Sequence, residues 1–245
     1  MRIGAETEAT QPTRRIRTET LLLVGSAAIL LGFGVVLSVY VRRAELVPGE
    51  LAATSWFAGI DSPPVLWGSE FLDAISEFEV APVVFAVVLP VVLLLWGLRA
   101  LLLFAVAGSL TAVTAVANIA DRARPTEDLR FVEIVSDAGG YPSGHVVYGV
   151  LVFGMIAYLA FKHMRPGRAR SIVTAVMVTI AVLMGPSRVV ELDHWPADVV
   201  GSYLLSVPFL LGLIWLDRHP QMSPGGTVYS QALSVKSALK TRTLK

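Results

Sequence analysis

Six runs of roughly 17 to 22 residues that are almost free of charge divide this chain, and they constrain its fold more than any other feature. A helix needs about 20 apolar residues to cross the hydrocarbon core of a bilayer. Because lipid offers the backbone no hydrogen-bond partners, such runs predict spanning α-helices. The expected spans are residues 20–41, 80–98, 100–120, 146–162, 169–187 and 198–216.

Composition agrees with a polytopic membrane protein, since 54% of the 245 residues are hydrophobic and 16% are charged. We expect an all-α, integral-membrane six-helix bundle over residues 20–217, preceded by a cytoplasmic segment 1–19 and followed by a flexible cytoplasmic tail 218–245. The chain has no cysteine, which excludes disulfides and Cys-ligated metals. Its basic residues are spread over the membrane flanks, so no nucleic-acid partner is expected.

The distribution of lysine and arginine predicts the orientation of the spans. With the N-terminus inside, 14 of the 20 basic residues fall on the cytoplasmic side, where such residues are enriched. Both termini are then cytoplasmic in the cell membrane, and the polar strings that follow the third, precede the fourth and separate the fifth and sixth spans are extracytoplasmic. The first run exceeds the core of a signal peptide and is interpreted as a retained span; cleavage near residues 52–54 is the alternative.

The string between the fifth and sixth spans carries residues suited to phosphoryl transfer. Pro196 suits a first helical turn, and His194 and Asp198 then share one helix face. The Asp198 carboxylate can accept a hydrogen bond from one imidazole nitrogen and leave the other unprotonated, as a nucleophile. Arg188, at the end of the preceding run, offers a bidentate fork for phosphate oxygens.

A second string, Pro142-Ser143-Gly144-His145, opens the fourth span. A helix N-terminus attracts anions, Gly144 permits close approach of the backbone, and Ser143 adds a hydroxyl donor. His145 is placed to protonate a leaving oxygen as general acid. Arg124, followed by Pro125, would close the phosphate site from a third side.

These strings resemble the type-2 phosphatidic acid phosphatase superfamily, which comprises membrane lipid phosphatases related to vanadium haloperoxidases. The resemblance covers roughly residues 80–216, and the second and third family motifs match with the same spacing. It implies that His194 forms a phosphohistidine, that Asp198 orients it and that His145 is the acid. It also implies that Arg124, Ser143, Gly144 and Arg188 bind phosphate and that no metal or other cofactor takes part.

This sequence departs from the first motif of the family. Ala117 stands seven residues before Arg124, where the family has lysine. Arg122 is a candidate substitute phosphate ligand at a different spacing, and Asp121 could instead neutralise it. Glu191 and Asp193 either tune the charge of the site, recognise a headgroup or form a solvated loop face.

The sequence therefore predicts a metal-independent phosphatase acting on a lipid phosphomonoester or pyrophosphate. A polyprenyl pyrophosphate such as undecaprenyl pyrophosphate is expected first, and phosphatidate or phosphatidylglycerol phosphate next. The alternative is a non-catalytic membrane protein that binds or transports lipid phosphate through a degenerate site. The two differ over His194, whose imidazole is needed for hydrolysis but not for binding.

Overall fold

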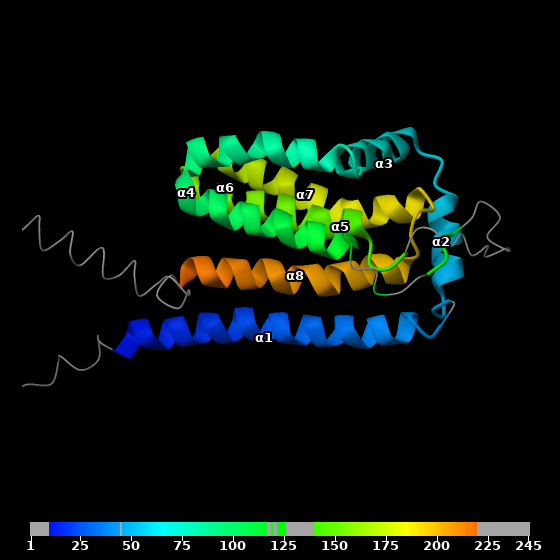
Figure 1. Ribbon diagram of the computed structural model, residues 1–245, viewed down its shortest axis with the longest axis horizontal. Helices are drawn as coiled ribbons and strands as arrows, with labels where there is room; N and C mark the ends of the chain where they lie inside the picture. The colour runs from blue at the N-terminus through cyan, green and yellow to red at the C-terminus, as the bar shows by residue number, and fades with distance from the viewer. Residues whose placement is uncertain (1–9, 45, 117–118, 120–121, 126–139, 220–245) are drawn as a thin grey trace, which may run out of the picture.

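The elements of this protein are all helices in the computed structural model, which describes residues 10–44, 46–116, 119, 122–125 and 140–219. Long helices lie side by side, and the short helix α2 crosses one end of them (Figure 1). The elements are α1 (Thr10–Val41), α2 (Glu50–Ala58), α3 (Pro63–Ser76), α4 (Ala81–Val116), α5 (Gly144–Tyr148), the π-helical η1 (Gly149–Phe153), α6 (Gly154–His163), α7 (Arg168–Val190) and α8 (Pro196–Arg218).

Within the part of the chain that the structure describes, five helical segments are long and apolar enough to cross a membrane. They are Thr18–Val41, Ala81–Ala112, Gly144–His163, Arg168–Val190 and Pro196–Arg218. The third joins α5, η1 and α6 into one central rod, since the residues at both junctions keep helical backbone angles. The protein is therefore a multi-pass membrane protein, with helices close to the ranges expected from the apolar runs.

Helix α4 differs from expectation, because the runs 80–98 and 100–120 lie in one element that folds back on itself. Gly97 has φ 84° and ψ 179°, a backbone conformation reserved for glycine. The rings of Phe85 and Phe104 stack with centroids 4.8 Å apart, whereas 19 residues of straight helix would separate them by about 28 Å. Figure 1 shows the two arms of α4 running back along each other. The structure thus joins the two runs in one element, and the number of six membrane crossings stays a prediction.

Two other helices begin at residues that differ from those expected from the apolar runs. Helix α1 begins at Thr10, inside the expected polar segment 1–19, because a helix started by an apolar span extends into its flank at little cost. The central rod begins at Gly144 rather than residue 146, so the Pro-Ser-Gly-His string enters its first turn, as the sequence indicates.

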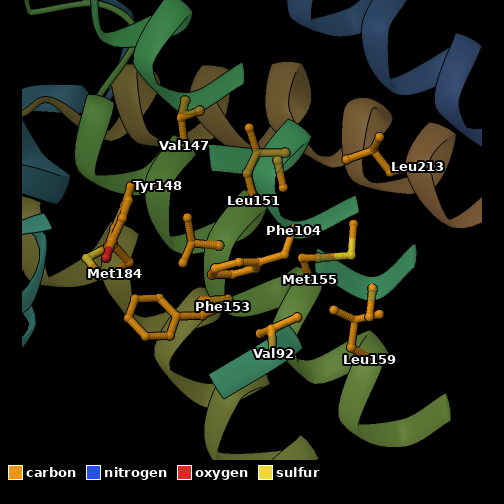
Figure 2. Packing of buried hydrophobic residues seen from close by; sticks show 14 of the residues in the cluster. Val92, Phe104, Val147, Tyr148, Leu151, Phe153, Met155, Leu159, Met184 and Leu213 are labelled. Carbon is orange, nitrogen blue, oxygen red and sulfur yellow. The ribbon is translucent and has the colours of Figure 1, made fainter. Parts of the chain in front are cut away.

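The core lies around the central rod. Val147, Leu151 and Leu159 of the rod are almost fully buried, and they pack with Phe104 of α4 and Leu213 of α8 (Figure 2). Outward residues of α4 are instead apolar and exposed, as suits contact with lipid. The rod thus provides a rigid support for the residues at its first turn.

Tyr141 fixes the segment that leads into this rod. Its hydroxyl lies 2.7 Å from the hydroxyl of Ser38 on α1, and its ring packs so closely on Gly201 of α8 that a Cβ there would come within 2.4 Å. Glycine at 201 is therefore required by close approach. This packing sets Ser143 and His145 at the end of the bundle.

Candidate active site

All of the residues expected at the site lie at one end of the bundle. Ser143, Gly144 and His145 begin the central rod, Arg188 ends α7, and Asp198 lies in the first turn of α8. This end carries α2 and α3, while α1 begins and α8 ends at the opposite end (Figure 1). We call it the site end.

His194 lies in the tight turn between α7 and α8. The backbone N–H groups of Asp193 and His194 both donate to the Arg188 carbonyl, at 3.0 and 3.2 Å. Leu192 adopts φ 60°, an uncommon conformation for a residue with a side chain. The turn folds the chain back so that the buried His194 ring lies near Arg188 and His145.

The hydrogen bond of His194 differs from the one expected. Its Nδ1 lies 2.8 Å from the carbonyl oxygen of Gly140, whereas Oδ2 of Asp198 is 3.9 Å away, beyond hydrogen-bond distance. A carbonyl oxygen only accepts, so Nδ1 donates this hydrogen bond, and in the neutral tautomer that it selects the lone pair is on Nε2. The expected tautomer therefore arises from a backbone group, with Asp198 acting at longer range.

Asp198 is fully buried and belongs to a second set of contacts. It accepts from the backbone N–H of Trp195 at 3.0 Å and from Nη1 of Arg122 at 2.8 Å. Arg122 also donates to both carboxylate oxygens of Glu50, at the start of α2. Glu50 in turn accepts the N–H of Ala197 at 3.0 Å. This buried charged network ties α2 to the first turn of α8.

The network changes the role expected for Arg122. Burial alone would lower the pKa of its guanidinium, but hydrogen bonds to Glu50 and the charge of Asp198 outweigh it and raise the pKa. Because its terminal nitrogens donate to two carboxylates, Arg122 is committed to the network. It is therefore a poor substitute for the family lysine, and Ala117, where that lysine would stand, lies outside the described residues.

Three expected phosphate ligands carry buried donor atoms without a partner. Among the described residues, no group accepts a hydrogen bond from Oγ of Ser143, Nε of Arg124 or Nη2 of Arg188. Leaving a buried donor unpaired costs about 1–3 kcal/mol, and more for a charged group. An anion bound between them would supply the missing acceptors.

Two carboxylates face the arginines of this phosphate site. Nη1 of Arg188 contacts Asp73 of α3 and lies 3.0 Å from Asp193. Asp193 is also 3.5 Å from Nη1 of Arg124, and Asp73 is 3.7 Å from Nε2 of His145. Asp193 therefore contacts both arginines, and its role in tuning the charge of the site stays a prediction. Partial burial raises the pKa of Glu191.

Three residues that contact the site, Glu50, Asp73 and Gly140, lie outside the sequence motifs. Glu50 and Asp73 lie in the outer segment between the first two apolar runs, more than 45 residues before Arg124. The signal that could have found them is the presence of acidic residues on two short, otherwise apolar helices, α2 and α3. No cluster of three metal-ligating side chains occurs among the described residues, and metal independence stays a prediction.

A profile of the PAP2 superfamily matches residues 83–220 of this chain, which is more than half of it. The chain therefore belongs to the PAP2 superfamily, a family of phosphatases, and the motifs at the site end are those through which its sequence resembles that family.

Two known proteins are similar to this chain, one in sequence and one in structure. Phosphatidylglycerophosphatase B of Bacillus subtilis (strain 168) is 33% identical over 89 residues, which are 36% of this chain and 42% of that relative. The sequence match thus spans less than half of the relative's length. The crystal structure of a transmembrane PAP2-type phosphatidylglycerolphosphate phosphatase from Bacillus subtilis superposes with a TM-score of 0.61 at 22% identity, covering 81% of this chain and 98% of that one. This likeness shows that the fold is shared.

Proposed function

We propose that this protein is a membrane lipid phosphatase that works through a phosphohistidine at His194. The observation that carries the proposal is the set of three buried, unpartnered donors on Ser143, Arg124 and Arg188, among the described residues. Three positions that the family motifs assign to phosphate lack acceptors in a site that also contains a histidine whose Nδ1 donates to the carbonyl of Gly140. Such donors stabilise a transferring phosphoryl group without reorganisation.

In the first step, Nε2 of His194 attacks phosphorus and the bond from phosphorus to the lipid oxygen breaks. His145, which is partly exposed, donates its proton to the leaving lipid oxygen as general acid. Arg188, Arg124 and Ser143 hold the equatorial oxygens, where charge is spread in the transition state. The products of this step are the lipid alcohol and N-phosphorylated His194.

In the second step, water attacks phosphorus and the bond to Nε2 breaks. His145, now deprotonated, takes the proton of the water as general base, and inorganic phosphate leaves. Gly140 holds the proton on Nδ1 throughout, while the buried Asp198 stabilises the ring's positive charge from 3.9 Å. Every charge in this scheme comes from side chains, so the activity should survive chelation.

The comparisons change the order of expected substrates. Both similar proteins are named as phosphatases of phosphatidylglycerol phosphate, and we therefore propose this lipid first. Undecaprenyl pyrophosphate, which the sequence alone placed first, and phosphatidate follow. All three present a terminal phosphate at the depth where helix ends meet the headgroups.

We also propose that the site end faces the outside of the cell. The basic residues Lys162, Arg165, Arg168 and Arg170 lie at the opposite end, around the turn between α6 and α7. Because the chain has no cysteine, single cysteines introduced at Asp61 and at Arg165 show on which side of the membrane each end of the bundle lies. An impermeant maleimide applied to intact cells should label Asp61→Cys and not Arg165→Cys; the reverse pattern contradicts the orientation.

The function is tested by phosphate release from the three lipids by purified protein in detergent with a chelator. His194→Ala should abolish release. The matched control is His163→Ala, since this histidine lies at the opposite end of the rod and stacks on Trp96. The control should retain wild-type activity.

The same assay separates hydrolysis from binding. Release from phosphatidylglycerol phosphate that disappears only in the His194 variant establishes the phosphatase. Lipid phosphate that binds to wild-type protein and to His194→Asn without any release would instead establish a binding or transport protein.

A further inference from the structure

Asp73 occupies a place at the site that the two-step reaction does not require. It lies on α3, and its Oδ1 contacts Nη1 of Arg188 and is 3.7 Å from Nε2 of His145. Arg188 is fully buried, whereas the Asp73 side chain is 44% exposed. One negatively charged oxygen thus faces both the phosphate ligand and the general acid.

A phosphate ester would present an oxygen to the same two groups. In the proposed reaction Arg188 holds an equatorial oxygen and His145 faces the leaving oxygen, so the Asp73 carboxylate and a bound phosphate compete for this space. Nη1 of Arg188 already contacts Asp73 and Asp193, so a phosphate on the unpartnered Nη2 brings a third anion to one guanidinium, and these anions repel each other in a partly buried site. Substrate binding therefore requires Asp73 to move away from Arg188.

Asp193, the other carboxylate on Arg188, is held differently. Its backbone N–H donates to the Arg188 carbonyl at 3.0 Å, so it is fixed by the turn that also positions His194. Asp73 comes from a separate helix, and its side chain is partly exposed, so a change of its rotamer would leave that turn undisturbed. Of the two, Asp73 is the one that phosphate can displace.

Resting on the proposed phosphatase function, we propose that Asp73 is a competing carboxylate that occupies the phosphate site until substrate displaces it, and so lowers the affinity of the site for phosphate. It weakens the binding of every phosphate by a similar factor. A lipid retains affinity through burial of its tails, whereas inorganic phosphate has only the headgroup contacts. Asp73 therefore weakens inhibition by inorganic phosphate and speeds the release of the product.

The test compares Asp73→Asn with Glu70→Gln, a matched loss of one carboxylate charge at an exposed position of the same helix. The inhibition constant of inorganic phosphate against lipid hydrolysis should fall about tenfold in Asp73→Asn, since a charge-assisted contact no longer competes. The KM for lipid should fall as well. Glu70→Gln should match the wild type, and Asp73→Ser replaces the asparagine variant if that one does not fold.

Phosphate binding is also measured without turnover, as the phosphate concentration that half-saturates thermal stabilisation of the protein. This concentration should fall about tenfold in Asp73→Asn, whether or not the wild type hydrolyses lipid. An unchanged or higher value in a folded Asp73 variant would overturn the proposal and leave Asp73 as a structural partner of Arg188. Absence of hydrolysis in the wild type would instead contradict the proposed function alone.

Discussion

The two ends of the bundle both contain buried carboxylates bound by cations, but they are satisfied to different degrees. At the end opposite the site, the Asp217 side chain is fully buried and accepts from Nε of Arg99 at 2.7 Å, from the hydroxyl of Tyr158 at 2.6 Å and from Lys162. These side chains come from α4, α6 and α8. We call this group the Asp217 cluster.

At the site end, by contrast, donors remain unused. Among the described residues, Ser143, Arg124 and Arg188 each keep a buried donor without an acceptor, whereas no side-chain donor or acceptor of the Asp217 cluster is left in that state. A satisfied cluster stabilises the fold, and an unsatisfied one lowers stability until a ligand completes it. The charges at the Asp217 cluster therefore hold helices together, and we propose that those at the site end bind an anion.

The largest expected effect concerns two arginines, one from each end. Arg188→Gln should lower kcat/KM by about 10³, because removal of one donor to a developing charge typically has this effect. Arg99→Gln, at the Asp217 cluster, should keep wild-type kcat/KM. Steady-state kinetics on both variants measure this, and equal losses in the two would break the comparison.

A second pair of variants neutralises one buried carboxylate at each end. Glu50→Gln should lower the free energy of unfolding by about 3–5 kcal/mol, because the buried Arg122 loses one of its two carboxylates. Asp217→Asn should lower it less, by about 1 kcal/mol, because Arg99 and Lys162 are partly exposed to solvent. Only Glu50→Gln should also lower kcat, since Glu50 holds Arg122 against Asp198. Thermal denaturation and activity of the folded fraction are measured together. An activity loss in Asp217→Asn alone would contradict the division between the ends.

The smallest effects are expected at two serines of the site end. Ser143→Ala should lower kcat/KM about tenfold by removing a hydrogen bond to a charged ligand, without loss of stability, because its hydroxyl has no partner among the described residues. Ser202 accepts from the Ser143 N–H at 2.7 Å and donates to the Asp198 carbonyl at 2.6 Å. Ser202→Ala should therefore lower stability by about 1 kcal/mol. A stability loss in Ser143→Ala would show that its hydroxyl has a structural role.

The sequence predicted the helices well because membrane burial leaves a local signal. Apolar runs mark α1, α7 and α8 closely, since every backbone group inside lipid must bond within its own helix. The fold-back of α4 at Gly97 was hidden, because the two runs appear as separate spans whether a loop or a single glycine joins them.

The site was predicted where its residues lie within motifs and was incomplete where contacts join distant segments. Ser143, His145, Arg188 and His194 come together from two short strings, but the hydrogen bond from His194 to Gly140 involves a backbone carbonyl that no side-chain pattern reveals. Glu50 and Asp73 reach the site through helix packing. Such contacts depend on tertiary structure, which local sequence patterns do not predict.

The central claim, that His194 is the nucleophile, is tested most directly by trapping the intermediate. Purified protein is mixed with phosphatidylglycerol phosphate labelled in its terminal phosphate, quenched in alkali within one turnover, digested and mapped by mass spectrometry. We expect acid-labile label on His194 and none in the His194→Ala protein. Turnover that proceeds at the wild-type rate with no label on His194, or with label on another residue, would contradict the central claim.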